Sequence, residues 1–298
     1  AVIEHGSKLS VELATAYLAR CDASAHTMDY LIHLGLKLGG FLNEAGWYAD
    51  AERVLLRVKD LCQSLPQTTY YKRLTLECCH RLLNTQSAYC CFPAASETYK
   101  LALELLGIPD DVTGPMPNGP FAFGDRSFYR ENEQQTDDTA DRLSSLSVSG
   151  DESSPSEGQQ YLVWRRPVYG ADALVVRTCK EISSLFFIRC DYCAAHAWAM
   201  RALALLTPHT PPKITIEVLR ACGKACVVKR RFTQAGILVR QAVALARRVF
   251  GPHHPRYAAA LLDYGFYLLN IDSITHSVAV YEVSQTILRS EFEKQGCW

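Results

Sequence analysis

Apolar residues recur along most of this chain at the spacing of an amphipathic helix, and short polar breaks separate the helical segments. In residues 28–45 leucines return every three or four positions until Gly46 ends the pattern. The same periodicity predicts helices over 1–21, 28–45, 48–65, 68–83, 94–106, 171–188, 193–206, 214–228, 232–249, 257–270 and 275–290. The link from Asn84 to Pro93 is expected to be longer than the other turns.

Small residues recur in the second helix of each of the last three predicted helix pairs. The two recurring positions are occupied by Ala195, Ala235 and Ser277, and then by Ala202, Ala242 and Ser284. The first set is separated by 40 and 42 residues, a long version of the tetratricopeptide period. A single helix pair cannot bury its apolar face alone, so the pairs are expected to stack. The sequence therefore predicts an all-α, tetratricopeptide-like α-solenoid of about five helix pairs.

The composition changes sharply in the middle of the chain. Residues 109–160 have four prolines within their first twelve positions and end in the acidic, serine-rich run DDTADRLSSLSVSGDESSPSEGQQ. Such a segment buries too little apolar area to offset its ordering entropy, which predicts a disordered insertion. We interpret it as a solvated linker; the alternative is a regulatory loop phosphorylated at Ser154. The predicted units are hairpins in 1–108, the insertion in 109–160, three repeats in 161–292 and a tail in 293–298.

The overall charge does not favour nucleic acid or an anionic membrane as a partner. The 31 basic and 31 acidic residues cancel, so nothing favours nucleic acid or an anionic membrane. No apolar run approaches the roughly 20 residues that cross a bilayer. We therefore expect neither a nucleic-acid-binding protein nor a transmembrane segment.

Twelve cysteines raise the question of a metal site. We interpret them as reduced thiols that act as small apolar residues, and we expect no metal and no cofactor. The alternative is zinc held by Cys190, Cys193, Cys222 and Cys226. The last two are four residues apart within one predicted helix, whereas structural zinc more often uses a turn for at least one pair.

Catalytic motifs are missing from the sequence. It contains no phosphate-binding G-x-x-x-x-G-K-S/T, no H-E-x-x-H and no G-x-S-x-G. His253 and His254 adjoin prolines, with no cysteine or carboxylate at a spacing that would complete a catalytic set. We therefore expect a protein that is not an enzyme.

Three runs carry a specific resemblance to a known family. They are LGGFLNEAGWYADAERVLL (38–56), VLRACGKACVVKRRF (218–232) and LLDYGFYLLNIDSITHSVAVY (261–281), and they resemble the amyloid protein-binding protein 2 family. The likeness extends over 1–108 and 170–290. More broadly, the long repeats and the turn at 251–255 look like those of kinesin light chain.

The resemblance implies a cytoplasmic, non-catalytic adaptor, with membrane-vesicle, microtubule and nuclear association as further expectations. It implies a substrate receptor of a cullin-2 RING ubiquitin ligase, assembled through elongin B and C. Such a receptor recognises C-terminal degrons and the tail of the amyloid precursor protein. The alternative is a microtubule-associated cargo adaptor, similar to kinesin light chain, for the transport of membrane proteins.

A basic stripe is the candidate peptide site. In stacked helix pairs the first helices line a groove, which places Arg177 and Lys180 beside Arg220 and Lys224. Two such basic pairs suit a peptide carboxylate or an acidic side chain. Asn270 is a further candidate for holding a peptide backbone. The alternative is a solvated face, partly neutralised by the neighbouring carboxylates of Glu181 and Glu217.

Overall fold

The computed structural model describes residues 2–20, 28–108 and 171–294. Within these ranges the chain forms eleven α-helices and no strand. The helices are α1 (Val2–Arg20), α2 (Met28–Glu44), α3 (Tyr48–Ser64), α4 (Thr69–Ala88), α5 (Phe92–Leu106), α8 (Ala171–Ile188), α9 (Tyr192–Ala204), α10 (Pro212–Val228), α11 (Phe232–Phe250), α12 (Pro255–Asn270) and α13 (Ile274–Lys294). The all-α prediction is confirmed, whereas the predicted insertion at 109–160 lies outside the described residues.

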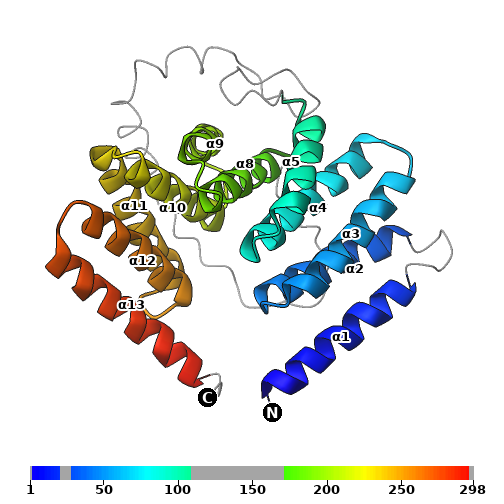
Figure 1. The fold of residues 1–298 in the computed structure, drawn as a ribbon, viewed down its shortest axis with the longest axis horizontal. Coiled ribbons are helices and arrows are strands. Elements are labelled where there is room, and N and C mark those ends of the chain that lie inside the picture. Colours follow the sequence, from blue (N-terminus) through cyan, green and yellow to red (C-terminus); the bar gives the residue numbers. More distant parts are fainter. Residues whose placement is uncertain (1, 21–27, 109–170, 295–298) are drawn as a thin grey trace, which may run out of the picture.

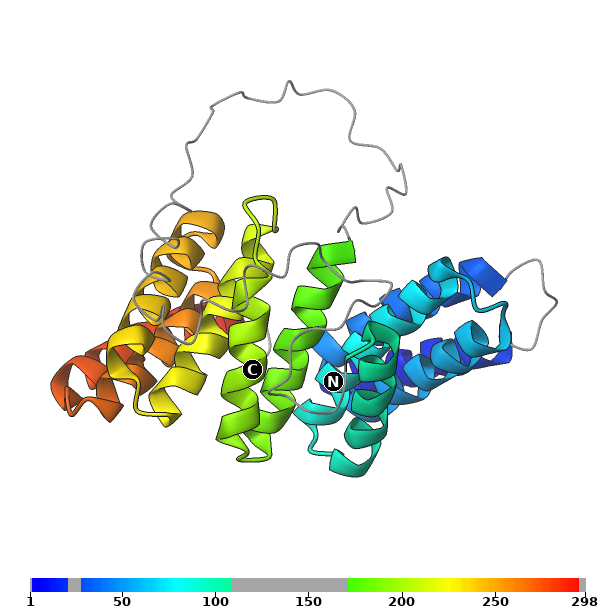
Figure 2. The same cartoon turned by 90° about the horizontal axis from the view of Figure 1, so that it is seen from above.

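After α1, the helices pair into five antiparallel hairpins, in the order α2–α3, α4–α5, α8–α9, α10–α11 and α12–α13. The hairpins follow one another around an arch whose two ends lie on the same side (Figure 1). First helices pack on first helices, so that α4 contacts α8 although residues 89–170 separate them in the sequence. A second view shows the same order of hairpins (Figure 2). The described residues therefore form one tetratricopeptide-like α-solenoid.

Small residues let the two helices of each hairpin approach closely. A Cβ added at Gly39 would lie 2.5 Å from Leu55 Cγ, and one at Gly223 would lie 2.5 Å from Val239 Cγ1. The third hairpin has Ser183 at this position, and its hydroxyl donates to the carbonyl of Ala195 twelve residues later. The recurring positions of the second helices, from Ala195 to Ser284, are all buried. The repeat register inferred from these small residues is confirmed.

The turn from α4 to α5 differs from its prediction. The helix continues to Ala88, and only residues 89–91 separate it from α5. A residue of the preceding hairpin stabilises the last turn of this helix, because Gln86 Nε2 donates to Glu52 Oε1 of α3 at 2.8 Å. The expected long link from Asn84 to Pro93 is therefore wrong. At the other end of the chain, α13 extends to Lys294, beyond the predicted end at residue 290.

All five hairpin turns share one backbone conformation. Each has a residue with positive φ, which is a glycine only at Gly46; the others are Cys90 (62°), Cys190 (63°), Arg230 (57°) and Asp272 (59°). The amide of the next residue closes the turn, as Arg231 N does on the carbonyl of Cys226 at 2.9 Å. A left-handed conformation is costly for a residue with a Cβ and free of that cost for glycine.

Replacing Arg230 with glycine is expected to stabilise the protein by about 0.5–1 kcal/mol, because glycine removes the Cβ strain of this turn. The thermal midpoint followed by circular dichroism measures the gain. The Arg230→Ala variant is the matched control, since it removes the charge and keeps the Cβ. An equal gain in both variants would show that the charge, and not the backbone, causes the effect.

Candidate functional site: a polar pocket on the first helices

A polar pocket of about 260 Å³ lies along the first helices of all five hairpins. Every residue that lines it belongs to one of these helices. The lining residues are Gly40, Asn43 and Glu44 of α2, His80, Arg81 and Asn84 of α4, Arg177, Lys180 and Glu181 of α8, Lys213, Ile214 and Glu217 of α10, and Arg256 of α12. The stacking of first helices thus builds one site from segments far apart in the sequence.

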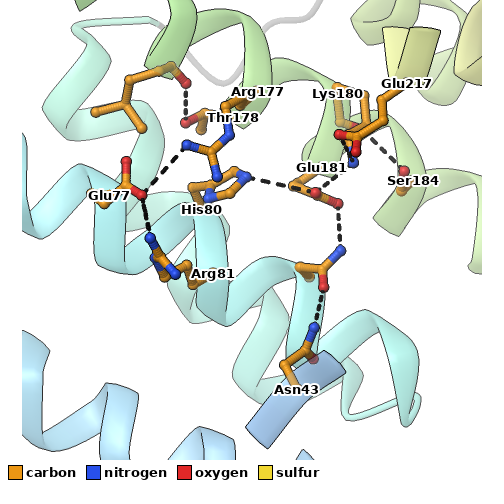
Figure 3. A network of polar contacts seen from close by, with 12 residues as sticks. Asn43, Glu77, His80, Arg81, Arg177, Thr178, Lys180, Glu181, Ser184 and Glu217 are labelled. Carbon is orange, nitrogen blue, oxygen red and sulfur yellow. Dashed lines mark hydrogen bonds and ion pairs between the residues drawn. The ribbon is translucent and has the colours of Figure 1, made fainter. Parts of the chain in front are cut away.

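Glu181 is the centre of the polar network in this pocket. The residue is only 4% exposed, and Lys180 Nζ lies 2.5 Å from its Oε1 atom. Its Oε2 atom accepts a hydrogen bond from Asn84 Nδ2 at 3.1 Å, and His80 Nε2 lies 3.7 Å from Oε1. These side chains converge between α4 and α8 (Figure 3). The buried carboxylate therefore joins two hairpins that are distant in the sequence.

A second carboxylate, Glu77, joins the same two helices. Its Oε1 atom lies 2.9 Å from Arg81 Nη2 and 3.5 Å from Arg177 Nη1 (Figure 3). Arg81 also donates through Nη1 to the carbonyl of Leu36 at 2.9 Å, which connects α4 to α2. Both guanidinium groups are thus held in place at the edge of the pocket.

Three cations surround Glu217. Its carboxylate lies 2.9 Å from Arg256 Nη1 and 3.8 Å from Lys180 Nζ. Burial alone would raise the pKa of Glu217, but the charges of Lys180, Arg256 and Lys213 outweigh burial and lower it. Glu217 therefore stays ionised, and it only partly neutralises the cations around it.

The pocket keeps an excess of positive charge. Its lining has five cations, Arg81, Arg177, Lys180, Lys213 and Arg256, against the carboxylates of Glu44, Glu181 and Glu217. Glu77 beside the lining neutralises part of the charge of Arg81 and Arg177, which leaves an excess of one cation. The Lys213 side chain is exposed, so its ammonium group is open to a ligand. An arrangement of this kind favours an anion, and bidentate guanidinium contacts favour a carboxylate in particular.

The candidate residues of the basic stripe divide into two groups. Arg177 and Lys180 line the pocket, whereas Arg220 and Lys224 lie beyond it on α10, next to Asp263 of α12. Asp263 Oδ2 lies 2.5 Å from Arg220 Nε, and its Oδ1 atom lies 3.9 Å from Lys224 Nζ. Burial lowers the pKa of Lys224, and Asp263 opposes that effect. This half of the stripe is therefore paired within the protein, and its role in binding stays a prediction.

Asn270 lies apart from the pocket. Its exposed side chain donates through Nδ2 to the carbonyl of Phe266 at 2.8 Å, one turn earlier in α12. The structure thus places Asn270 as a satisfied residue at a helix end, and its contact with a peptide backbone stays a prediction.

The four candidate zinc cysteines lie in different environments. Cys190 and Cys193 are exposed at a turn, whereas Cys222 and Cys226 are buried in α10. Cys222 Sγ donates to the carbonyl of Ala199 at 3.1 Å, and burial raises the pKa of Cys226 to about 11. Among the residues that the structure describes, no group of three or more His, Cys, Asp or Glu side chains could hold a metal ion. Cys222 and Cys226 act as apolar core residues.

Of the two adjacent histidines, His254 has a structural role. His254 caps α12 and accepts a hydrogen bond from the Arg256 amide at 3.0 Å through Nδ1. Its ring also stacks on Phe250, with centroids 5.0 Å apart. This histidine is thereby occupied in forming the turn before α12.

Sequence reasoning missed the polar residues that α2 and α4 contribute, above all His80, Asn84 and Asn43. A usable signal exists in the sequence. Leu83 lies seven residues before the turn residue Cys90, as the crossing residue Ser183 lies seven residues before Cys190. His80 and Lys180 each lie three residues before these positions. Aligning the second hairpin with the later ones reveals this equivalence. The wrong link after residue 83 concealed it.

Comparison with known proteins finds curated relatives of similar sequence. No protein-family model matches the chain. Over 296 residues it is 34% identical to amyloid protein-binding protein 2 of rat and, equally, of mouse, which covers 98% of this chain and 41% of each relative. The chain is similar to amyloid protein-binding protein 2. It spans about two fifths of the length of these relatives.

Among solved structures, the chain resembles tetratricopeptide-like repeats of a putative kinesin light chain from Podosopora anserina. That likeness has a TM-score of 0.49 and 12% identity, and it covers 92% of this chain and 99% of the other. In the described part of this chain, no helix is long and apolar enough to cross a membrane.

Proposed function

We propose that the chain is a non-catalytic tetratricopeptide-like adaptor whose pocket holds the carboxylate at the end of a protein tail. The observation that carries the proposal is the excess of cations over carboxylates in a pocket built from five first helices. Helical repeat grooves commonly bind extended peptides, and a terminal carboxylate is a frequent anchor in such recognition. The similarity to amyloid protein-binding protein 2, whose name describes the binding of amyloid protein, supports a protein as the ligand.

The resemblance also supports a cellular role for this binding. We propose that the chain presents C-terminal degrons to a cullin-2 RING ligase in the cytoplasm, together with elongin B and C. Affinity purification from cells tests this role. Recovery of elongin and cullin-2 supports the ligase, whereas recovery of tubulin or kinesin heavy chain without them supports the transport adaptor instead.

Carboxylate recognition has a direct test. Short peptides selected from a library with free C-termini are resynthesised as carboxamides, and fluorescence anisotropy compares the two forms. The free acid is expected to bind at least about tenfold more tightly, because one charge-assisted hydrogen bond is worth about 1.5–3 kcal/mol. Equal affinity of the two forms would contradict the proposal.

Two exposed cations provide a matched pair of variants. Lys213→Glu reverses a charge on the pocket lining, and we expect it to weaken free-acid binding about tenfold. Arg289→Glu makes the same change on α13, which contributes no residue to the pocket lining, and we expect it to leave binding unchanged. The double variant Arg220→Glu with Lys224→Glu tests the paired half of the basic stripe in the same assay, provided that circular dichroism shows a folded protein.

A further inference from the structure

Positive charge is concentrated in one part of the chain, although the chain as a whole is neutral. Residues 192–262 contain eleven lysines and arginines and a single acidic residue, Glu217. Two of these cations on the first helices have carboxylate partners, since Arg220 pairs with Asp263 and Arg256 pairs with Glu217. Much of the remaining charge lies on α11, the second helix of the fourth hairpin.

Three arginines of α11, Arg240, Arg247 and Arg248, form a surface that we call the arginine face. Spacings of seven and eight residues place them on one side of the helix, and all three are exposed. The helix dipole favours cations in the last turn, where Arg247 and Arg248 lie, but it does not account for Arg240. Among the described residues, no carboxylate forms an ion pair with any of the three guanidinium groups.

The other second helices lack a face of this kind. Acidic residues accompany the basic ones on α3, α5 and α13, and the one arginine of α9 is buried. α11 itself contains no acidic residue, and it packs against α10 and α12. The carboxylates of those two helices, Glu217 and Asp263, are already paired with cations of the first helices. No described neighbour therefore neutralises the arginine face.

The complementary charge lies in a stretch of sequence outside the described residues. Residues 131–157 contain eight acidic residues and one arginine, and we call them the acidic segment. They belong to the part of the chain that joins α5, which ends at Leu106, to α8, which begins at Ala171. The same chain thus contains both an unpartnered cationic face and a strongly acidic segment.

The chain that contains the acidic segment is attached at the edge of the solenoid where α11 ends. From α8 to α13 the hairpin turns lie at one edge, and the links between hairpins lie at the other (Figure 2). Because α4 packs beside α8, the end of α5 and the start of α8 also lie at the edge of the links, as do Arg247 and Arg248. Packed helices lie about 8–10 Å apart, whereas residues 107–170 can span about 200 Å when extended. The acidic segment can therefore reach α11.

We propose that the arginine face of α11 binds the acidic segment of the same chain. Arginine side chains form bidentate hydrogen bonds with carboxylates, and attachment gives the segment an effective concentration on the order of millimolar. Several exposed ion pairs then act together, although each one contributes little alone. Because the pocket is lined only by first helices, this contact on a second helix leaves the pocket open and does not depend on the function proposed above.

Carbodiimide crosslinking tests the contact in the full chain. The reagent joins lysine amines, but not arginines, to carboxylates that touch them. The triple variant Arg240→Lys, Arg247→Lys and Arg248→Lys therefore keeps the charge and makes the face reactive. We expect crosslinks from α11 to residues 131–157, with a yield that falls at least about fivefold in about 1 M salt, where the Debye length is about 3 Å. Arg289→Lys on α13 is the matched control, and we expect it to give no crosslink to the acidic segment.

The crosslinked products decide between the sources of the segment. Absence of crosslinks between α11 and residues 131–157 overturns the inference, and so does an equal yield from the Arg289→Lys variant. Isotopically labelled protein is mixed with unlabelled protein before the reaction. Crosslinks within one isotopic form alone assign the segment to the same chain, whereas mixed pairs assign it to a second copy and contradict the proposal.

Proteolysis measures the same contact without added lysines. In the triple variant Arg240→Ala, Arg247→Ala and Arg248→Ala, we expect a glutamate-specific protease to cleave within residues 131–157 about fivefold faster, because the weak surface pairs are lost together. Arg289→Ala should leave the rate unchanged. All four side chains are exposed, so the variants are expected to remain folded, which circular dichroism checks. An unchanged rate in the triple variant overturns the inference.

Discussion

Replacing Trp198 with alanine is expected to reduce the free energy of unfolding by about 3–5 kcal/mol, the usual cost of truncating a fully buried tryptophan. The ring is completely inaccessible to solvent. It packs edge-on against Tyr99 of α5, with centroids 6.2 Å apart, and the Arg201 guanidinium lies 4.9 Å from its centroid. Because Trp198 lies on α9 and Tyr99 on α5, the loss weakens the contact between two hairpins as well as the hairpin that contains the tryptophan.

Urea unfolding followed by circular dichroism measures the effect of Trp198→Ala. Trp47→Ala is the matched control, since Trp47 is only half-buried at the first hairpin turn and packs at the edge of its cluster. We expect Trp47→Ala to cost less than half as much. Equal costs for the two variants would mean that burial at the hairpin junction is not what makes Trp198 important.

Replacing Glu181 with alanine is expected to destabilise the protein by about 3 kcal/mol, because removing one partner of a buried pair leaves the others desolvated and unpaired. Lys180 would lose its contact at 2.5 Å, and Asn84 would lose its acceptor. Peptide binding should also fall, since this carboxylate holds Lys180 and Asn84 in place at the pocket. Thermal unfolding and fluorescence anisotropy measure the two effects on the same samples.

Two further variants serve as controls for Glu181→Ala. Glu181→Gln removes only the charge, and Glu293→Ala removes a carboxylate from the surface. The glutamine keeps the shape and one acceptor, so we expect a smaller loss of stability than with alanine. Glu293 forms a surface ion pair with Arg289, and its removal should cost no more than about 1 kcal/mol. A Glu181→Ala variant as stable as Glu293→Ala would contradict the central role of the buried carboxylate.

The amphipathic periodicity and the small residues predicted most of the fold correctly. Helix positions depend on local spacing, and the hairpin register depends on which residues are small enough for a close crossing, such as Gly223 and Ala235. Both signals lie within one hairpin and can be read without the rest of the chain. The error after residue 83 arose where a polar-looking segment is helical, because the buried side chain of Gln86 finds a partner, Glu52, in the neighbouring hairpin.

The candidate site was predicted only in part. The basic residues of the first helices could be placed on one face by helical spacing, and Arg177 and Lys180 do line the pocket. Glu181 and Glu217 were also expected to neutralise this face in part, and both lie beside Lys180. The other two carboxylate partners, Glu77 and Asp263, could not be found in this way. Glu77 and Arg177 are separated by 100 residues, and Arg220 and Asp263 by 43, so no local pattern connects them.

The sequence by itself determined the helices, their pairing and the small residues at which paired helices cross, because each of these depends on neighbours within one hairpin. Only the tertiary structure decided which charges are neutralised and which remain exposed. The stacking of α4 on α8 brings His80 and Asn84 to Glu181, across the long stretch of chain between these helices. The chemistry of the pocket therefore depends on contacts between hairpins, and those contacts exist only when the solenoid is assembled.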